Sequence, residues 1–299
     1  MQLPIHDLAA LGTATCWATS ALFSAEAVRA MGAFHFNLVR QVFVTALLAL
    51  AVWVTGAGLW PGVPTVLWLA ASGVMGILLG DTVNFAAVGR LGPRRAGAVF
   101  ALNAPMAAAL GWLFLGEVLS LQAVAGITLT VAGVALAILG RAGAVAHRLE
   151  TTQGKLAVGL GFGLLAGLGQ ATGSLIARPI LHGGMDPYLA SLIRVGASGL
   201  VMSLLAATPL APIRPGPFTR RALAYAAATA LIGLFLGMTL LLYALQGGET
   251  GIIATLSATS PVIILPLLWL RTGQRPRPLA WAGAGLAVVG LALIFLRAA

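Results

Sequence analysis

Residues 92–117 read GPRRAGAVFALNAPMAAALGWLFLGE, and the pattern of this segment recurs later in the chain. Arginines open it, a long apolar run follows, and Asn103 and Pro105 interrupt that run before it ends in Gly116-Glu117. Proline has no backbone N–H, so it cannot bond the carbonyl four residues back. In hydrocarbon, a carbonyl freed in this way must find a partner in protein or in a water-filled cavity. The stretch therefore predicts a membrane helix that is broken at Pro105.

The same pattern returns at residues 251–273, GIIATLSATSPVIILPLLWLRTG, where Pro261 takes the place of Pro105. Other landmarks recur at nearly the same offset, so the chain is interpreted as a tandem duplication. Helix breaks in matching positions of two halves are the best sequence indication of a transporter's binding site. A kink that serves packing alone is the alternative for either proline. The repeated landmarks are Arg40 with Arg194, Gly76 and Gly80 with Gly233 and Gly237, and Gly126 and Gly133 with Gly283 and Gly290.

The composition is that of a membrane protein. The chain is 60% hydrophobic and 8% charged, with a mean hydropathy of +1.00, whereas soluble domains carry about 25% charged residues. A net charge of +10 would suggest nucleic acid in a soluble chain, but here the basic residues occupy short loops, and we expect no nucleic-acid partner. Cys16 is the only cysteine, which excludes an internal disulfide. We expect neither a metal site nor a cofactor.

Ten helical spans, each of about twenty residues, fit the apolar runs of an all-α polytopic protein. The polar segment 141–155 separates two five-helix repeats, which we place at residues 1–145 and 146–299. The first residues lack the basic region of a cleaved signal peptide, so the first run is expected to stay as a span. The spans are expected at 8–27, 34–55, 64–86, 95–115, 119–140, 155–178, 187–207, 220–244, 250–270 and 279–297.

The basic residues predict the orientation. Positively charged loops face the cytoplasm, and the odd-numbered connections hold thirteen of the seventeen lysines and arginines. Both termini are therefore expected outside, in a multi-pass protein of the inner (plasma) membrane. Because five spans is an odd number, the two halves insert in opposite senses and form an inverted repeat. The thirteen residues are Arg29, Arg90, Arg94, Arg95, Arg141, Arg148, Lys155, Arg214, Arg220, Arg221, Arg271, Arg275 and Arg277.

These features resemble the EamA-type members of the drug/metabolite transporter superfamily: two five-span repeats, an arginine early in each second span, and a proline midway along each fourth span. Within that superfamily the chain looks most like the bacterial exporters of amino acids and related metabolites, notably of aromatic amino acids. The resemblance implies ten helices around a central cavity lined by spans 1, 3, 4, 6, 8 and 9, with alternating access. One departure is Gly273, which stands where the first repeat has Glu117.

Three ionisable residues lie inside the expected spans, where each is a functional hypothesis by default. Arg40 and Asp81 lie at similar depth, so we expect them to pair. The pair either orients spans 2 and 3 or takes part in coupling, through proton exchange or through breakage by the substrate. Arg194 is expected to snorkel to the outer interface rather than to bind a substrate carboxylate, because Met238 stands where symmetry would place an acid.

The other expected cavity residues are neutral. A mostly apolar cavity with a few polar groups suits a small amphipathic metabolite, and backbone groups freed at Pro105 and Pro261 are expected to help to hold a zwitterion. The alternative for the serines and threonines is a hydrogen bond to their own helix backbone. The expected substrate-binding residues are Trp17, Ser20, Asn84, Phe100, Asn103, Gln170, Ser174, Tyr243, Thr255, Ser257 and Thr259.

The sequence thus predicts a secondary transporter that exports amino acids with aromatic or other large apolar side chains. The alternative is multidrug or other metabolite efflux within the same superfamily. Small multidrug exporters of that superfamily use a glutamate embedded in span 1, whereas here Glu26 lies at the end of the span. No H-E-x-x-H, G-x-S-x-G or Walker motif is present, so we expect neither an enzyme nor a built-in ATPase. Both halves of the cavity lie in one chain, which favours a functional monomer.

Overall fold

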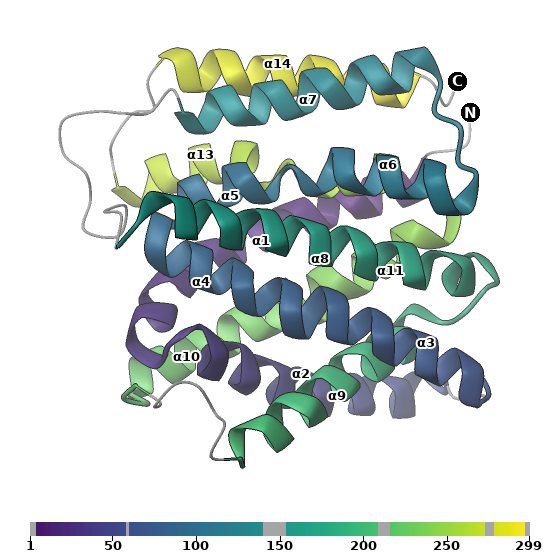
Figure 1. Ribbon diagram of the computed structural model, residues 1–299, viewed down its shortest axis with the longest axis vertical. Helices are drawn as coiled ribbons and strands as arrows, with labels where there is room; N and C mark the ends of the chain where they lie inside the picture. Colours follow the sequence, from purple (N-terminus) through teal and green to yellow (C-terminus); the bar gives the residue numbers. More distant parts are fainter. Residues whose placement is uncertain (1–3, 58–59, 140–153, 209–215, 273–277, 297–299) are drawn as a thin grey trace.

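The computed structural model describes residues 4–57, 60–139, 154–208, 216–272 and 278–296. Throughout these residues the regular structure is helical, and no strand occurs among them (Figure 1). Seven helical stretches of the described chain are long and apolar enough to cross a membrane. Three shorter apolar helices cover Asn103–Leu115, Leu121–Leu136 and Pro278–Gly290. The all-α membrane class is therefore confirmed, whereas the exact number of ten spans stays a prediction.

The first half begins with two long helices and continues with a 29-residue helical stretch over Val63–Leu91. A broken span and a single helix follow. Its elements are α1 (Ile5–Met31), α2 (Ala33–Thr55), α3 (Val63–Gly73), the π-helix η1 (Val74–Asp81), α4 (Thr82–Leu91), α5 (Pro93–Phe100), α6 (Asn103–Leu115) and α7 (Leu121–Leu139).

The second half repeats this order of elements, including the π-helix and the broken span. Its elements are α8 (Leu156–His182), α9 (Pro187–Ala206), α10 (Arg220–Thr229), the π-helix η3 (Ala230–Leu236), α11 (Gly237–Gly247), α12 (Thr250–Ser257), α13 (Ser260–Thr272) and α14 (Pro278–Leu296). The last helices of the two halves, α7 and α14, pack against each other at one edge of the bundle (Figure 1).

Both predicted helix breaks are present. Helix α5 ends at Phe100 and α6 begins at Asn103, while α12 ends at Ser257 and α13 begins at Ser260. Pro105 and Pro261 fall in the first turn of α6 and α13, where a missing N–H leaves no bond unmade. Each proline therefore starts a new helix just after the break.

The carbonyls at the breaks already have partners, which corrects the expectation that they are free to hold a substrate. The Ala101 carbonyl accepts from the Ala104 N–H at 3.2 Å. The Ser257 carbonyl accepts from the Ser260 hydroxyl at 3.0 Å. Backbone groups left unpaired in a membrane cost several kcal/mol, and the turns at both breaks are shaped to avoid that cost.

The two π-helices, which the sequence did not predict, occupy matching positions in the two halves. Such i→i+5 segments are rare and often occur at functional sites. Helix α9 of the second half packs against η1, and α2 of the first half packs against η3. Glycine allows this close approach: a Cβ at Gly76 would lie 3.3 Å from Nη2 of Arg194, and one at Gly233 would lie 3.6 Å from Nη2 of Arg40. Each repeated arginine thus lies beside the π-helix of the other half.

Candidate functional site

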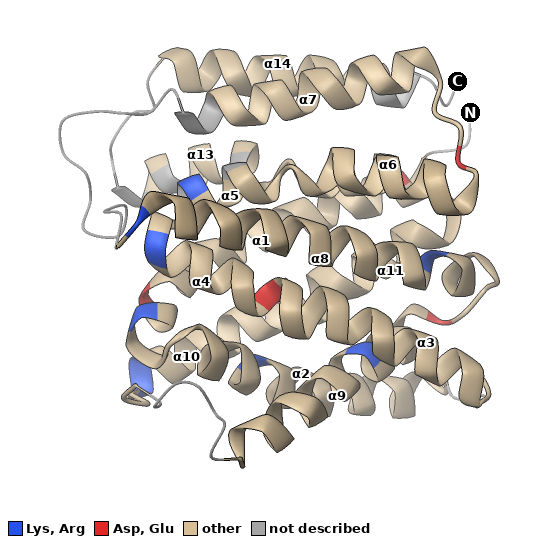
Figure 2. Cartoon of the chain, in the orientation of Figure 1, with Lys and Arg blue, Asp and Glu red and all other residues tan. Residues whose placement is uncertain are grey.

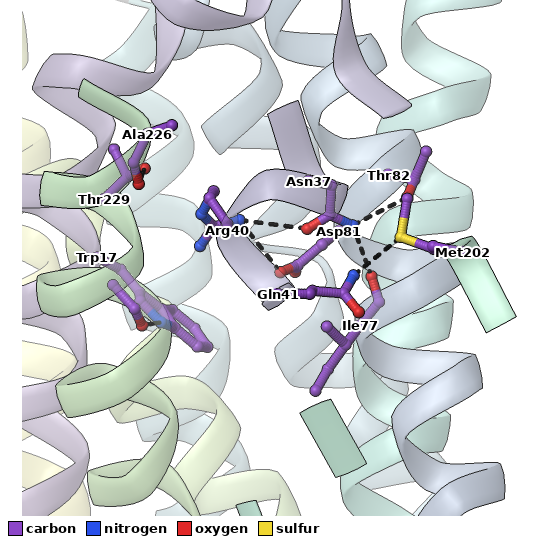
Figure 3. Close-up of polar contacts among 11 residues, drawn as sticks. Trp17, Asn37, Arg40, Gln41, Ile77, Asp81, Thr82, Met202, Ala226 and Thr229 are labelled. Carbon is purple, nitrogen blue, oxygen red and sulfur yellow. Dashed lines mark hydrogen bonds and ion pairs between the residues drawn. The ribbon is translucent and has the colours of Figure 1, made fainter. Parts of the chain in front are cut away.

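A buried ion pair lies at the centre of the bundle. Nη1 of Arg40, on α2, is 3.6 Å from Oδ2 of Asp81, the last residue of η1, so the structure pairs the two residues as expected (Figure 3). Asn37 supports the pair: its Oδ1 accepts from Arg40 Nη1 at 3.5 Å, and its Nδ2 donates to the Ile77 carbonyl at 3.1 Å. The Asn37 side chain therefore fixes α2 against the π-helix that carries Asp81.

Two aromatic rings surround the same guanidinium group. The Cζ atom of Arg40 lies 4.7 Å from the ring centroid of Phe85 and 5.5 Å from that of Phe36. A cation over a desolvated ring face is stabilised by the ring quadrupole. The charge of Arg40 is thus balanced by one carboxylate and by two aromatic faces.

Arg194 does not reach the outer interface, and the expectation of snorkelling was wrong. Its exposed fraction is 0%, and Nε, Nη1 and Nη2 are buried without a hydrogen-bond partner. Gly73 and Gly76, which leave room on the face of α3 and η1, let α9 bring this arginine into the interior. Asp81 interacts electrostatically with Arg194 as well as with Arg40. One buried carboxylate therefore serves two buried arginines.

Trp17 and Phe100 meet beside this charged centre. The indole Nε1–H of Trp17, on α1, donates to the Gly233 carbonyl of η3 at 3.2 Å. Its ring meets Phe100, at the end of α5, edge-on with centroids 6.3 Å apart. Ser20 lies one turn along α1 from Trp17, and its side chain also lies against Gly233. The structure thus brings together the expected residues of spans 1 and 4 at the π-helix of span 8.

The expected polar residues of spans 4 and 6 lie close to the first break. Asn103 is buried and donates from Nδ2 to the Phe100 carbonyl at 2.7 Å, so its amide caps the end of α5. Gly167 of α8 lies against the backbone of Asn103, and the backbone N of Gln170 lies against Gly80 of η1. Ser174 is buried on α8, and Asn84 is part-buried on α4.

The hydroxyls of the ninth span bond to their own helix. Thr255 donates to the Gly251 carbonyl at 2.7 Å, Ser257 to that of Ile253 at 2.8 Å, and Thr259 to that of Leu256 at 2.7 Å. This is the alternative that the residue types raised. Because these hydroxyls already donate their protons to backbone carbonyls, they could only accept a hydrogen bond from a substrate.

Tyr243 lies apart from the aromatic pair. Its ring centroid is 5.0 Å from that of His6, and its carbonyl bonds to His6 Nδ1 at 3.0 Å. His6 precedes Trp17 by eleven residues on α1, which is about 16 Å along a helix. The structure therefore does not join Tyr243 to the group around Trp17 and Phe100.

One polar cluster was missed by sequence reasoning. Both carboxylate oxygens of Glu117 accept from the backbone N–H of Thr250, at 3.2 and 3.0 Å, and Oε1 also accepts from the Thr250 hydroxyl at 2.9 Å. Arg178 Nε lies 3.7 Å from Oε1. In the sequence Glu117 stands out only as the end of the repeated motif, and no functional role was predicted for Arg178.

The charged residues separate along the bundle. Figure 2 shows lysines and arginines gathered at the end where α4 ends and α5 and α10 begin, and more acidic residues at the opposite end. At the basic end Arg221 pairs with Glu26, with Nη2 and Oε2 3.0 Å apart. Long apolar helices, matched broken spans and buried charges at the centre together define a multi-pass membrane transporter.

The chain belongs to the EamA-like transporter family, whose model matches it twice, over residues 4–139 and 157–296. The family is one of small-molecule transporters of the drug/metabolite type. A search of the curated proteins finds none that matches. Twenty-eight chains of solved structures match. One of them, described as "Crystal structure of protein", is 18% identical with a TM-score of 0.76 over 98% of this chain and 97% of its own length, and it shows the same fold.

Proposed function

We propose that the protein is a secondary exporter of amino acids with aromatic or other large apolar side chains, and that it works by alternating access as a monomer. The observation that carries this proposal is the Trp17–Phe100 pair, which lies beside a helix break and a π-helix. Aromatic rings stack edge-on or offset with one another at a gain of about 1 kcal/mol beyond the area that they bury. A substrate ring that enters between these two side chains would exchange one such contact for two.

In this proposal the basic end of the bundle faces the cytoplasm of a cell with the protein in its inner membrane. Both chain termini then lie outside. The substrate enters from the basic end, binds near Trp17, Phe100, Asn103 and Gln170, and leaves at the end where α12 begins.

The buried charges are proposed to couple transport to an ion gradient. Among the residues that the structure describes, Asp81 is the carboxylate that interacts with both Arg40 and Arg194. A proton on Asp81, or a substrate carboxylate at an arginine, would disrupt the Arg40–Asp81 pair. This would weaken the contact between η1, which carries Asp81, and α2, which carries Arg40. If so, Asp81→Asn abolishes the pH dependence of transport. A pH profile that stays unchanged in this variant would remove Asp81 from the mechanism.

Multidrug or other metabolite efflux is the second candidate. Cation exporters need a carboxylate within the membrane to attract their substrate. Glu26, near the end of α1, pairs with the exposed Arg221. Asp81, inside the bundle, pairs with Arg40 and also interacts with Arg194, so both carboxylates are already balanced by arginines. This observation favours a zwitterionic or neutral substrate over a cation.

Counterflow in proteoliposomes tests the proposal without knowledge of the coupling ion. Vesicles loaded with unlabelled amino acids are diluted into labelled phenylalanine, threonine or methionine. We expect transient accumulation of phenylalanine that tyrosine and tryptophan inhibit. Absence of counterflow for every amino acid, with protein that is monodisperse in detergent, would reject amino acids as substrates and favour the second candidate.

A further inference from the structure

A carboxylate from the first half holds the beginning of a helix in the second half. Glu117 follows α6 and binds Thr250, the first residue of α12, through the backbone N–H and the hydroxyl. The side chains of Glu117 and Arg178 are each 12% exposed, and Thr250 is completely buried. Hydrogen bonds to a charged group are about twice as strong as neutral ones. A negative charge at a helix N-terminus is further stabilised by the helix dipole.

Helix α12, whose first residue Glu117 binds, is buried along its whole length in the protein. All eight residues of α12 are buried. Gly251 lies so close to α6 that a Cβ there would come within 2.7 Å of the Cα of Ala108. Both halves of the molecule therefore meet tightly at this end, with Glu117 at the rim of the contact.

The matching helix of the first half is packed less tightly. Helix α5 corresponds to α12 in the repeat. Of its side chains that the structure describes, Ala96 is buried, Arg95 is exposed, and Gly97, Val99 and Phe100 are part-buried. The sequence also differs, because Gly273 stands at the position that matches Glu117. Glycine has no carboxylate, so residue 273 cannot play for α5 the role that Glu117 plays for α12.

We propose that Glu117 is the latch of the extracytoplasmic gate. It holds α12 against α6 while the opposite end is open, and release of Thr250 lets the outer end open. Arg178 keeps the Glu117 carboxylate paired when Thr250 is released. Glu117 is thus a positioning residue for transport, and the inference rests on the alternating access proposed above.

The test measures access to α12 from each side of the membrane in the full-length protein. Cys16→Ser removes the native thiol, and Ser257→Cys places a nearly isosteric reporter near the end of α12. Membrane-impermeant thiol reagents are applied to vesicles of each orientation. With Glu117→Gln we expect outside labelling to rise about tenfold, because losing a hydrogen bond to a charged group shifts a two-state equilibrium by that order. Labelling from the cytoplasmic side should fall.

A rise in outside labelling together with a fall in cytoplasmic labelling distinguishes a latch from a merely structural role. General destabilisation would raise labelling from both sides, and that result, or no change, would overturn the proposal. Thr250→Val keeps the carboxylate and removes one of its partners, so an increase in the same direction but smaller is expected. Glu26→Gln is the matched control, since it removes a paired carboxylate at the opposite end and should leave the outside rate unchanged.

The assay contains no substrate, so it does not depend on the proposed amino acids. Failure of counterflow together with reciprocal labelling would reject the substrate and keep the latch. Reciprocal labelling with the two sides exchanged would support the latch and reverse the proposed orientation.

Discussion

Asp81 pairs with the buried Arg40 and also interacts electrostatically with the buried Arg194, so one negative charge faces two positive charges. Breaking a buried ion pair by removing one partner costs about 3–5 kcal/mol, because an unpaired charge stays behind. Asp81→Asn leaves Arg40 and Arg194 without a carboxylate, so we expect a marked fall in the thermal unfolding midpoint in detergent.

The substitution Arg194→Met tests the other buried arginine, and it should not lower stability. It removes the guanidinium whose three nitrogens have no hydrogen-bond partner and leaves the Arg40–Asp81 pair intact. Methionine fills a similar space without a charge. We therefore expect a midpoint equal to or above that of the wild type, and counterflow then shows whether Arg194 serves transport. A midpoint that falls as far as in Asp81→Asn would show that the attraction between Arg194 and Asp81 outweighs the cost of burying this guanidinium group.

Trp17 offers a second test at the scale of one residue. Trp17→Ala removes both the ring facing Phe100 and the donor to the Gly233 carbonyl. Since an aromatic pair contributes about 1 kcal/mol beyond its area, we expect the half-saturating phenylalanine concentration in counterflow to rise at least about fivefold. Threonine transport should change less. Trp53→Ala, at a side chain 80% exposed on α2, is the control, and an equal effect there would argue against a substrate contact.

Part of this residue-level arrangement could be predicted from the sequence. Arg40 and Asp81 were matched because two opposite charges at similar depth in neighbouring spans must compensate each other. Arg194 was misplaced, because its environment comes from Gly73 and Gly76 in the other half, and one sequence does not reveal contacts between halves. Glu117 was missed for the same reason, since its partner Thr250 lies 133 residues further along the chain.

At the scale of elements, the broken spans were predictable because proline has a strict backbone requirement. The hydrogen-bond partners of the carbonyls at the breaks could not be predicted. The bonds from the Ala104 N–H and from the Ser260 hydroxyl depend on the geometry of each turn. The π-helices η1 and η3 were also beyond prediction. Apolar periodicity does not separate them from α-helix over seven or eight residues.

The break at Pro105 can be tested directly. Pro105→Ala restores an N–H that can bond the Ala101 carbonyl, so α5 and α6 can join into one helix. We expect unchanged or higher thermal stability together with a loss of counterflow, because a continuous helix carries Phe100 and Asn103 away from their present positions. Pro266→Ala is the control: Pro266 lies inside α13 and has no proline mate in the first half. Normal transport by Pro105→Ala would show that the break serves packing alone.

At the scale of the whole molecule, the sequence predicts an inverted repeat from simple counting. Five expected spans per half is an odd number, and the basic residues fall in alternate connections. In the structure, basic residues gather at one end of the bundle (Figure 2), while the membrane topology stays a prediction. The unequal packing of α5 and α12 could not be foreseen, because a repeat in sequence implies symmetry whereas a single conformation of a transporter breaks it.

The predicted orientation in the membrane can be tested with reporter fusions. Each basic residue that stays on the cytoplasmic side biases insertion, and the charge difference between the two sets of loops is large enough to fix one topology. Alkaline phosphatase is active only outside the cytoplasm. Green fluorescent protein fluoresces only in the cytoplasm, because it does not fold into its fluorescent form when it is exported unfolded. We expect phosphatase activity from a fusion after residue 299 and fluorescence from a fusion after residue 145, where the first half ends. The reverse pattern would place both termini in the cytoplasm, and the Glu117 latch would then close the cytoplasmic end instead.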